Sequence, residues 1–264
     1  MRVKIYILTD MEGISGIWRP EQVQKGTSEY ERGRRLLCED VNAAIAGAFD
    51  GGATEVVVLD GHGDGNNFIL EVMDDRAIYE TVKSSLEVMP SLDETFSGLI
   101  QVGCHAMAGT LNAFLDHTQS STTWFNLYIN GRRFGEIGQA GAYAGAFGVP
   151  VIMVTGDKAA CDEAQSFFGD IEVVAVKVGL GRNKAKCIAP KMAQKMIYDA
   201  AVRAVQRAKS GEFKPLILEN PIEMRLELCR SDYADEYAAR PGVERVDART
   251  VRKIIKSAKE IYYW

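Results

Sequence analysis

The sequence predicts an α/β protein of three layers, in which a mainly parallel (mixed) sheet lies between two layers of helices, with a small α+β extension at the C-terminus. Short apolar runs alternate with longer amphipathic segments over most of the chain, and this alternation is typical of strand–helix–strand units. Several runs are apolar almost throughout, as expected of strands that a parallel sheet buries on both faces. Beyond residue 210 apolar and polar residues alternate strictly, which favours half-exposed antiparallel strands.

The first strand–helix–strand unit has the clearest pattern. Residues 3–8 form a short run rich in β-branched and aromatic side chains, which predicts a strand. The segment from about 28 to 49 places apolar residues on one helical face and is stopped by Asp50-Gly51-Gly52. Residues 55–60 predict a second buried strand, so the two strands should be joined by a right-handed crossover.

The middle of the chain continues this order and adds a hairpin. Residues 98–103 predict a third strand. A fourth strand over 125–129 meets Asn130-Gly131, which is a strong hairpin signal, and the chain returns over 133–136. The small residues of 138–148 predict a helix that packs closely on the sheet.

The remaining segments divide into the end of the sheet and the extension. Further strands are expected at 150–155 and 172–178, and helices at 158–168 and 190–209. The extension should contain strands at 222–228 and 243–248, whereas 251–256 is compatible with a helix or a strand. We therefore expect an α/β domain over residues 1–210, and a small α+β extension over 211–264 that packs on it and serves oligomerisation or completes a pocket.

Composition and charge exclude several classes of function. The chain has 264 residues, 47% of them apolar, which is enough for a sizeable core. A formal net charge of −5 argues against a nucleic-acid partner, which would need a basic face. No apolar run approaches the roughly 20 residues of a membrane span, and the N-terminal run lacks the features of a secretory signal. Five cysteines without a Cys-x-x-Cys pair favour a reducing cytoplasm over a disulfide framework.

Two carboxylates follow the first strand, in the stretch Thr9-Asp10-Met11-Glu12-Gly13. Because side chains alternate along an extended backbone, Asp10 and Glu12 should lie on the same face. Two like charges side by side are costly unless a cation lies between them. Carboxylate oxygens are good ligands for Zn²⁺, Mn²⁺ or Mg²⁺. Taken alone, such a pair is more often a solvated turn than a metal site.

Other potential ligands follow later strands. His62 comes after the second strand, His105 after the third, and Glu136 after the hairpin of the fourth. Loops at the carboxyl ends of parallel strands meet at one edge of the sheet. A single histidine after a strand is usually a satisfied loop or core residue, but all three histidines of this chain lie between residues 62 and 117. The joint pattern favours a binuclear metal site, with a charge of about −3 from the carboxylates against +4 from two zinc ions.

Longer motifs surround these residues. They are Thr9–Gly16 (TDMEGISG), Tyr30–Arg34, Asp60–His62, Gly103–Ala106, Tyr128–Asn130, Gly135–Gly138 and Gly156–Asp157. In this order and spacing the chain resembles the D-aminopeptidases of the DppA type, the zinc metallopeptidase family M55, to about residue 190. Residues 211–264 resemble the C-terminal part of the family more loosely.

The resemblance implies a role for each residue of the pattern. Asp10 would bridge two zinc ions, Glu12 and His62 would complete the ligands of one ion, and His105 and Glu136 those of the other. His117 matches the catalytic histidine of the family, as nucleophile or as acid and base. The resemblance also implies short peptide substrates with an N-terminal D-residue such as D-Ala, and a large ring-shaped homo-oligomer, a decamer.

The expected chemistry is metal-assisted hydrolysis of a peptide bond. Zinc polarises the scissile carbonyl and lowers the pKa of bound water towards ~7. A histidine, whose free pKa is about 6.5, can accept or deliver a proton at neutral pH.

Three alternatives stay open on the sequence. The first is a metal-dependent amidase that acts on another small amide or on L-peptides. The second is a cysteine hydrolase that uses Cys104 and His117. The adjacent His105 argues against it, because that residue is better explained as a metal ligand. The third is a non-catalytic metal-binding or peptide-binding protein, against which stands the complete set of ligands.

Overall fold

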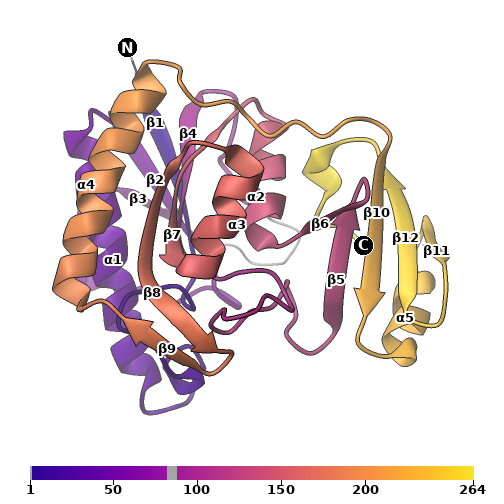
Figure 1. Ribbon diagram of the computed structural model, residues 1–264. Helices are drawn as coiled ribbons and strands as arrows, with labels where there is room; N and C mark the ends of the chain where they lie inside the picture. Colours follow the sequence, from indigo (N-terminus) through magenta and orange to yellow (C-terminus); the bar gives the residue numbers. More distant parts are fainter. Residues whose placement is uncertain (1, 82–87) are drawn as a thin grey trace.

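A seven-stranded sheet forms the centre of the molecule, which a computed structural model describes over residues 2–81 and 88–264 (Figure 1). Its strands are β1 (Lys4–Thr9), β2 (Glu55–Asp60), β3 (Ile78–Glu80), β4 (Phe96–Cys104), β7 (Val151–Asp157), β8 (Glu172–Gly181) and β9 (Lys184–Cys187). They lie in the order β3-β2-β1-β4-β7-β8-β9. All neighbours pair in parallel except β8 and β9, which pair antiparallel. The prediction of a mainly parallel, mixed sheet is confirmed.

Helices cover both faces of this sheet. On one face α1 (Tyr30–Asp50) and α4 (Pro190–Lys209) pack against each other and on the strands, and on the other face lie α2 (Glu136–Gly145) and α3 (Lys158–Phe168) (Figure 1). The strand β1 shows how the layers form, because Ile5 and Ile7 are buried towards α1 and α4 whereas Tyr6 is buried towards α2 and α3. The three-layer α/β/α architecture is therefore confirmed. Single 3₁₀ turns, η1 (Pro20–Gln22) and η2 (Leu70–Val72), lie in the loops after β1 and β2.

A second sheet lies beyond α2 and α3. It is antiparallel and contains β5 (Trp124–Ile129), β6 (Arg132–Phe134), β10 (Ile222–Leu228), β11 (Val243–Arg245) and β12 (Thr250–Ile255), in the order β11-β12-β10-β5-β6. The helix α5 (Ser231–Ala238) and the turn η3 (Ala258–Glu260) complete this part of the chain. Its apolar face buries Leu127, Met224 and Leu226 together with Ala142 of α2.

The structure corrects one expectation about the site. The hairpin at Asn130-Gly131 exists, with φ of 49° and 77° as a tight hairpin turn requires. Its strand β5, however, pairs with β10 of the second sheet and not with the parallel sheet. Glu136 therefore does not follow a strand of the parallel sheet but opens α2, directly after the hairpin.

The other differences are local. Residues 158–168 and 190–209 form helices at the predicted bounds, and the ambiguous segment 251–256 lies in the strand β12. The short strands β3 and β9 and the helix α5 were not predicted, and the strand expected at 243–248 spans only Val243–Arg245. The division at residue 210 stays a prediction, since the second sheet takes strands from both sides of that position. Within the two described ranges, no helix has both the length and the apolar character to cross a membrane.

Candidate metal centre

The site lies at the carboxyl edge of the parallel sheet, where the loop after β1 crosses the end of β4. Two backbone hydrogen bonds join them, from Asp10 N to Val102 O (2.8 Å) and from Gly13 N to Gly103 O (2.7 Å). Glycine is required on both sides, because a Cβ on Gly13 would collide with the carbonyl of Cys104 and one on Gly103 with that of Asp10. Gly103 also has a φ of +81°. This close approach brings the two carboxylates of the first loop next to His105.

The first half of the site contains Asp10, Glu12 and His62. His62 Nδ1 lies 2.9 Å from Asp10 Oδ1 and 3.1 Å from Glu12 Oε2. The Glu12 side chain is 7% exposed, and that of Asp10 is 20% exposed. The two carboxylates thus share one imidazole, as their position on one face of the chain predicts.

The second half contains His105, His117 and Glu136. Glu136 Oε1 lies 3.5 Å from His105 Nε2 and 3.7 Å from His117 Nε2. It also accepts a hydrogen bond from Gln119 N at 2.6 Å. His105 Nε2 lies 3.3 Å from Asp10 Oδ2, so Asp10 joins the two halves. All six residues predicted from the sequence are therefore brought together.

Each imidazole is oriented by a backbone carbonyl. His62 Nε2 lies 2.9 Å from Val23 O, His105 Nδ1 lies 3.0 Å from Ala106 O, and His117 Nδ1 lies 2.8 Å from Leu115 O. A ring nitrogen that meets a carbonyl must carry a proton, so the other nitrogen of each neutral ring has its lone pair towards the carboxylates. Histidines that bind metals are usually oriented in this way, by a hydrogen bond from the nitrogen that does not bind.

Without a metal the cluster binds protons. Burial disfavours a charged imidazole, yet the carboxylates of Glu12 and Asp10 raise the pKa of His62 to about 12. Burial and the charge of Glu12 raise the pKa of Asp10 to about 6. Burial alone would raise the pKa of Glu136, but the charges of His105 and His117 lower this pKa to about 2. Protons therefore hold the places between carboxylates and imidazoles that a cation would take.

The residues fit a metal in a second respect. Glu12 Oε2 and His105 Nε2 are buried and make no hydrogen bond to any part of the chain that the structure describes. Their nearest partners are charged members of the same cluster, His62 Nδ1 at 3.1 Å from Glu12 Oε2 and Asp10 Oδ2 at 3.3 Å from His105 Nε2. A buried polar atom that lacks a hydrogen bond is costly. Two sets of side chains have ligand atoms within 4.8 Å of one another, namely Asp10, Glu12 and His105, and His105, His117 and Glu136. Carboxylates and imidazoles are the ligands that Zn²⁺ takes at catalytic sites.

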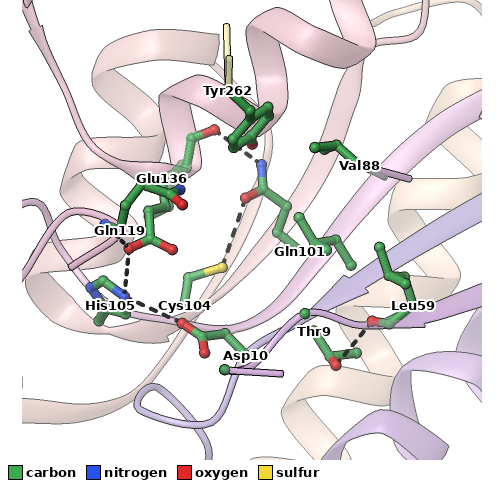
Figure 2. Close-up of a pocket in the computed structure, with 14 residues that line it drawn as sticks. Thr9, Asp10, Leu59, Val88, Gln101, Cys104, His105, Gln119, Glu136 and Tyr262 are labelled. Atoms are coloured by element: carbon green, nitrogen blue, oxygen red, sulfur yellow. Dashed lines mark hydrogen bonds and ion pairs between the residues drawn. The ribbon is translucent and has the colours of Figure 1, made fainter. Parts of the chain in front are cut away.

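A pocket of about 200 Å³ opens beside the cluster (Figure 2). Asp10, His105 and Glu136 form its charged wall, and apolar side chains form most of the rest, among them Leu8, Leu59, Val88 and Ile137. Glu12, His62 and His117 are not part of its lining. A small, mainly apolar molecule that enters this pocket would meet the carboxylates and the imidazole at one end.

Cys104 also lines the pocket, but its environment does not favour a nucleophile. Burial raises the pKa of its thiol well above the usual range, and the carboxylate of Asp10 acts in the same direction. Its Sγ donates to Gln101 Oε1 at 3.8 Å. The geometry gives no support to a cysteine hydrolase.

Some residues around the site were not found from the sequence. Gln101 and Tyr262 line the pocket, and the buried Lys177 donates to the carbonyl of Glu12 at 2.6 Å. Gln101 lies inside an apolar strand, where a single polar residue gives a weak signal. Lys177 and Tyr262 contact parts of the site that lie more than a hundred positions away in the sequence, and no local sequence pattern reveals such contacts.

The fold and the cluster together define an α/β protein with a candidate metal centre of carboxylates and imidazoles. The chain belongs to the M55 peptidases, since the model of that family, described as D-aminopeptidase, matches residues 3–264. A D-aminopeptidase of Bacillus subtilis (strain 168) is 34% identical over 263 residues, which cover 98% of this chain and 94% of that protein. A solved structure, described as the Zn-dependent D-aminopeptidase DppA from Bacillus subtilis, a self-compartmentalizing protease, is similar with a TM-score of 0.93 and 32% identity. The match covers 98% of this chain and 94% of the chain in that structure.

Proposed function

We propose that this protein is a zinc-dependent aminopeptidase that hydrolyses short peptides with an N-terminal D-residue such as D-Ala, with two zinc ions per chain. One observation carries the proposal. Three carboxylates and three oriented imidazoles converge at the sheet edge, and two of their buried atoms, Glu12 Oε2 and His105 Nε2, make no hydrogen bond within the described residues. Membership of the M55 family supports the reaction, and the name of the similar solved structure supports the metal.

The ligands divide as the two halves of the cluster suggest. Asp10 lies between His62 and His105 and would belong to both ligand sets. Glu12 and His62 would complete one ligand set. His105 and Glu136 would complete the other. When bound, the two zinc ions would supply Lewis acidity that polarises the scissile carbonyl and acidifies water.

The side chains perform the rest of the reaction. The free α-amino group of the peptide would lie at the end of the pocket formed by Asp10, His105 and Glu136, where a bound zinc ion would offer it a ligand position, and this would restrict hydrolysis to the N-terminal residue. His117 is held by Leu115 O through Nδ1, so its Nε2 is the atom that would accept a proton and deliver it to the leaving amine. The apolar walls exclude water and favour an apolar side chain.

The pocket also supports a small substrate residue. Its volume of about 200 Å³ lies below the roughly 300–1,000 Å³ of ordinary small-molecule sites. A methyl side chain such as that of alanine is suited to this space. The handedness of the substrate is taken from the family alone.

The assembly belongs to the same proposal. The similar Bacillus structure is called self-compartmentalizing, and we propose that this chain also forms a ring-shaped homo-oligomer, a decamer, in the cytoplasm. Sedimentation analysis would then give ten times the 29.1 kDa mass of the chain, and a monomer or dimer at micromolar concentration would contradict it.

The decisive experiment combines metal analysis with substrate profiling. Purified protein is saturated with zinc, desalted and analysed by mass spectrometry of the metal, and then assayed with D-Ala-D-Ala and L-Ala-L-Ala. We expect two zinc ions per chain and hydrolysis of the D-peptide. Hydrolysis of the L-peptide alone would contradict the proposed preference for an N-terminal D-residue. Bound zinc without hydrolysis of any small amide would overturn the enzymatic function.

A further inference from the structure

The C-terminal segment returns from the second sheet to the pocket. After β12 the chain makes the turn η3, whose start is capped by Ser257 and Glu260, and this turn packs against α2, the helix that begins at Glu136 (Figure 1). Tyr262 follows two residues after the turn and is one of the residues that line the pocket (Figure 2). The second sheet therefore supplies a side chain to a site whose metal ligands all precede residue 137.

Tyr262 is fixed in place by its neighbours. Ile261 before it is fully buried in the core of the second sheet. Lys253 Nζ donates to the carbonyl of Tyr263 at 3.1 Å. The ring of Trp264 meets Trp124 edge-on, with 6.0 Å between centroids. Since both sides of Tyr262 are anchored, the position of its ring does not depend on a bound ligand.

The ring of Tyr262 has a partner, whereas its hydroxyl has none among the residues that the structure describes. The ring contacts Tyr143 of α2 in a T-shaped arrangement, with 6.0 Å between centroids. The hydroxyl makes no hydrogen bond to residues 2–81 or 88–264. In Figure 2 the side chain lies on the opposite side of the pocket from Thr9 and Asp10. It thus presents an unpaired donor to the space in which a substrate would lie.

Each of the other neutral polar side chains with a hydroxyl or amide in the pocket makes at least one hydrogen bond. Thr9 Oγ1 donates to Leu59 O at 3.1 Å, and Gln101 Nε2 donates to Ile137 O at 3.3 Å. Gln101 Oε1 accepts from Cys104, and Gln119 Nε2 donates to Gln139 Oε1 at 3.3 Å. Among the described lining residues, Tyr262 is therefore the hydroxyl or amide side chain that makes no hydrogen bond within the protein, and its hydroxyl is free to recognise a polar atom of the substrate.

We propose that Tyr262 is a substrate-contacting residue, whose hydroxyl donates a hydrogen bond to an oxygen of the bound peptide. This inference rests on the proposed function. A phenol is protonated at neutral pH, since its ordinary pKa is about 10, and a protonated hydroxyl needs an acceptor. A dipeptide offers two, the scissile carbonyl oxygen and the C-terminal carboxylate. The specificity of the site then depends on the C-terminal segment as well as on the parallel sheet.

The test is the variant Tyr262→Phe, which keeps the ring and its contact with Tyr143 and removes only the hydroxyl. Zinc-loaded protein is assayed with D-Ala-D-Ala and with D-alaninamide, which lacks the carboxylate. We expect kcat/KM for the dipeptide to fall about tenfold, as for the loss of one good hydrogen bond, with unchanged zinc content. Tyr263→Phe is the matched control, because Tyr263 does not line the pocket, and it should keep the wild-type kcat/KM.

The two substrates distinguish the two acceptors. An equal loss on both substrates would place the hydroxyl at the scissile carbonyl, and a loss on the dipeptide alone would place it at the carboxylate. Wild-type kcat/KM in Tyr262→Phe on both substrates would overturn the inference, and so would an equal loss in Tyr263→Phe.

Failure of the proposed function would give a different result. If the wild-type protein hydrolyses neither substrate, D-Ala-D-Ala becomes a stable ligand, and its Kd for zinc-loaded protein is measured by calorimetry. A Kd about tenfold weaker in Tyr262→Phe would still support the contact. An equal Kd, or no binding to the wild-type protein, would overturn it.

Discussion

The imidazole rings of His105 and His117 lie stacked, with 3.8 Å between their centroids and 13° between their planes. Both direct Nε2 towards the same oxygen of Glu136, at 3.5 Å and 3.7 Å. Their surroundings differ, since the side chain of His105 is 2% exposed and that of His117 is 17% exposed. The buried ring has the unpaired nitrogen that suits a ligand, and the more exposed ring is better placed to exchange protons.

The first prediction separates these two roles. His117→Ala should retain two zinc ions per chain and lose kcat by roughly 10²- to 10⁴-fold, the contribution typical of a general acid or base. The measurement is zinc content and kcat on the same preparation, with His105→Ala for comparison, which should lose zinc. If His117→Ala also loses an ion, His117 is a ligand, as its position beside Glu136 and His105 also allows.

The second prediction concerns Glu12, whose Oε2 is buried beside His62 and makes no hydrogen bond to the described part of the chain. Glu12→Ala should reduce the zinc content from two ions to one per chain and leave the circular dichroism spectrum unchanged, because the side chain holds the metal and not the fold. Glu71→Gln alters an exposed glutamate outside the site and serves as the control. Two zinc ions in Glu12→Ala would remove Glu12 from the ligand set.

The sequence predicts the position of a site residue when that position is determined by the strand next to it, and not when it is determined by a segment far away in the sequence. Asp10, His62 and His105 each follow a buried strand of the parallel sheet, so the rule that carboxyl ends meet at one edge was enough to bring them together. Glu136 is a different case. The hairpin before it was recognised, but its partner strand β10 lies about a hundred residues later, so nothing near residue 130 reveals the second sheet.

The residues that were missed have the same explanation. Tyr262 reaches the pocket because η3 packs on α2, and Lys177 reaches Glu12 across 165 positions of sequence. The roles proposed for the candidate metal ligands and for His117 rest on the family resemblance, since spacing alone is compatible with several metals and several reactions.

The third prediction concerns pH and Asp40 of α1, which holds the loop that carries Asp10 and Glu12. Its carboxylate is fully buried and accepts hydrogen bonds from Ser15 N and Ser15 Oγ, both at 2.7 Å. Burial raises the pKa of Asp40 from 3.8 to about 6, although the hydrogen bonds from Ser15 lower this pKa in part. The folded protein therefore keeps a proton that the unfolded chain releases, and the free energy of unfolding should fall as pH rises from about 4 to 6.

The amide of Asp40→Asn does not titrate, so the free energy of unfolding of this variant should lack the decrease that Asp40 causes. The free energy of unfolding of the variant minus that of the wild type should thus increase between pH 4 and pH 7, by at most about 3 kcal/mol. The measurement is urea denaturation of zinc-free protein at both pH values, with the exposed Asp75→Asn as control. A difference that stays constant with pH, or that decreases, would contradict the raised pKa.

The last prediction concerns Lys177, a buried cation behind the ligand loop. Its side chain is almost fully buried, and its Nζ donates to the carbonyls of Glu12 and Ile17, both at 2.6 Å. The same Nζ lies 4.9 Å from the ring centroid of Phe114, in the segment that leads to His117. Lys177 therefore contacts the loop of the first ligands and the segment of the proposed catalytic histidine at once.

Lys177→Met preserves most of the volume and leaves two buried carbonyls without this donor, which should cost about 2–4 kcal/mol of stability. Because the loop of Glu12 loses its anchor, the affinity for zinc should fall as well, measured by competition with a chromophoric chelator. Lys186→Met, on the exposed side of β9, is the matched control and should change neither quantity. A lower Tm together with wild-type zinc affinity would show that Lys177 stabilises the fold without positioning Glu12.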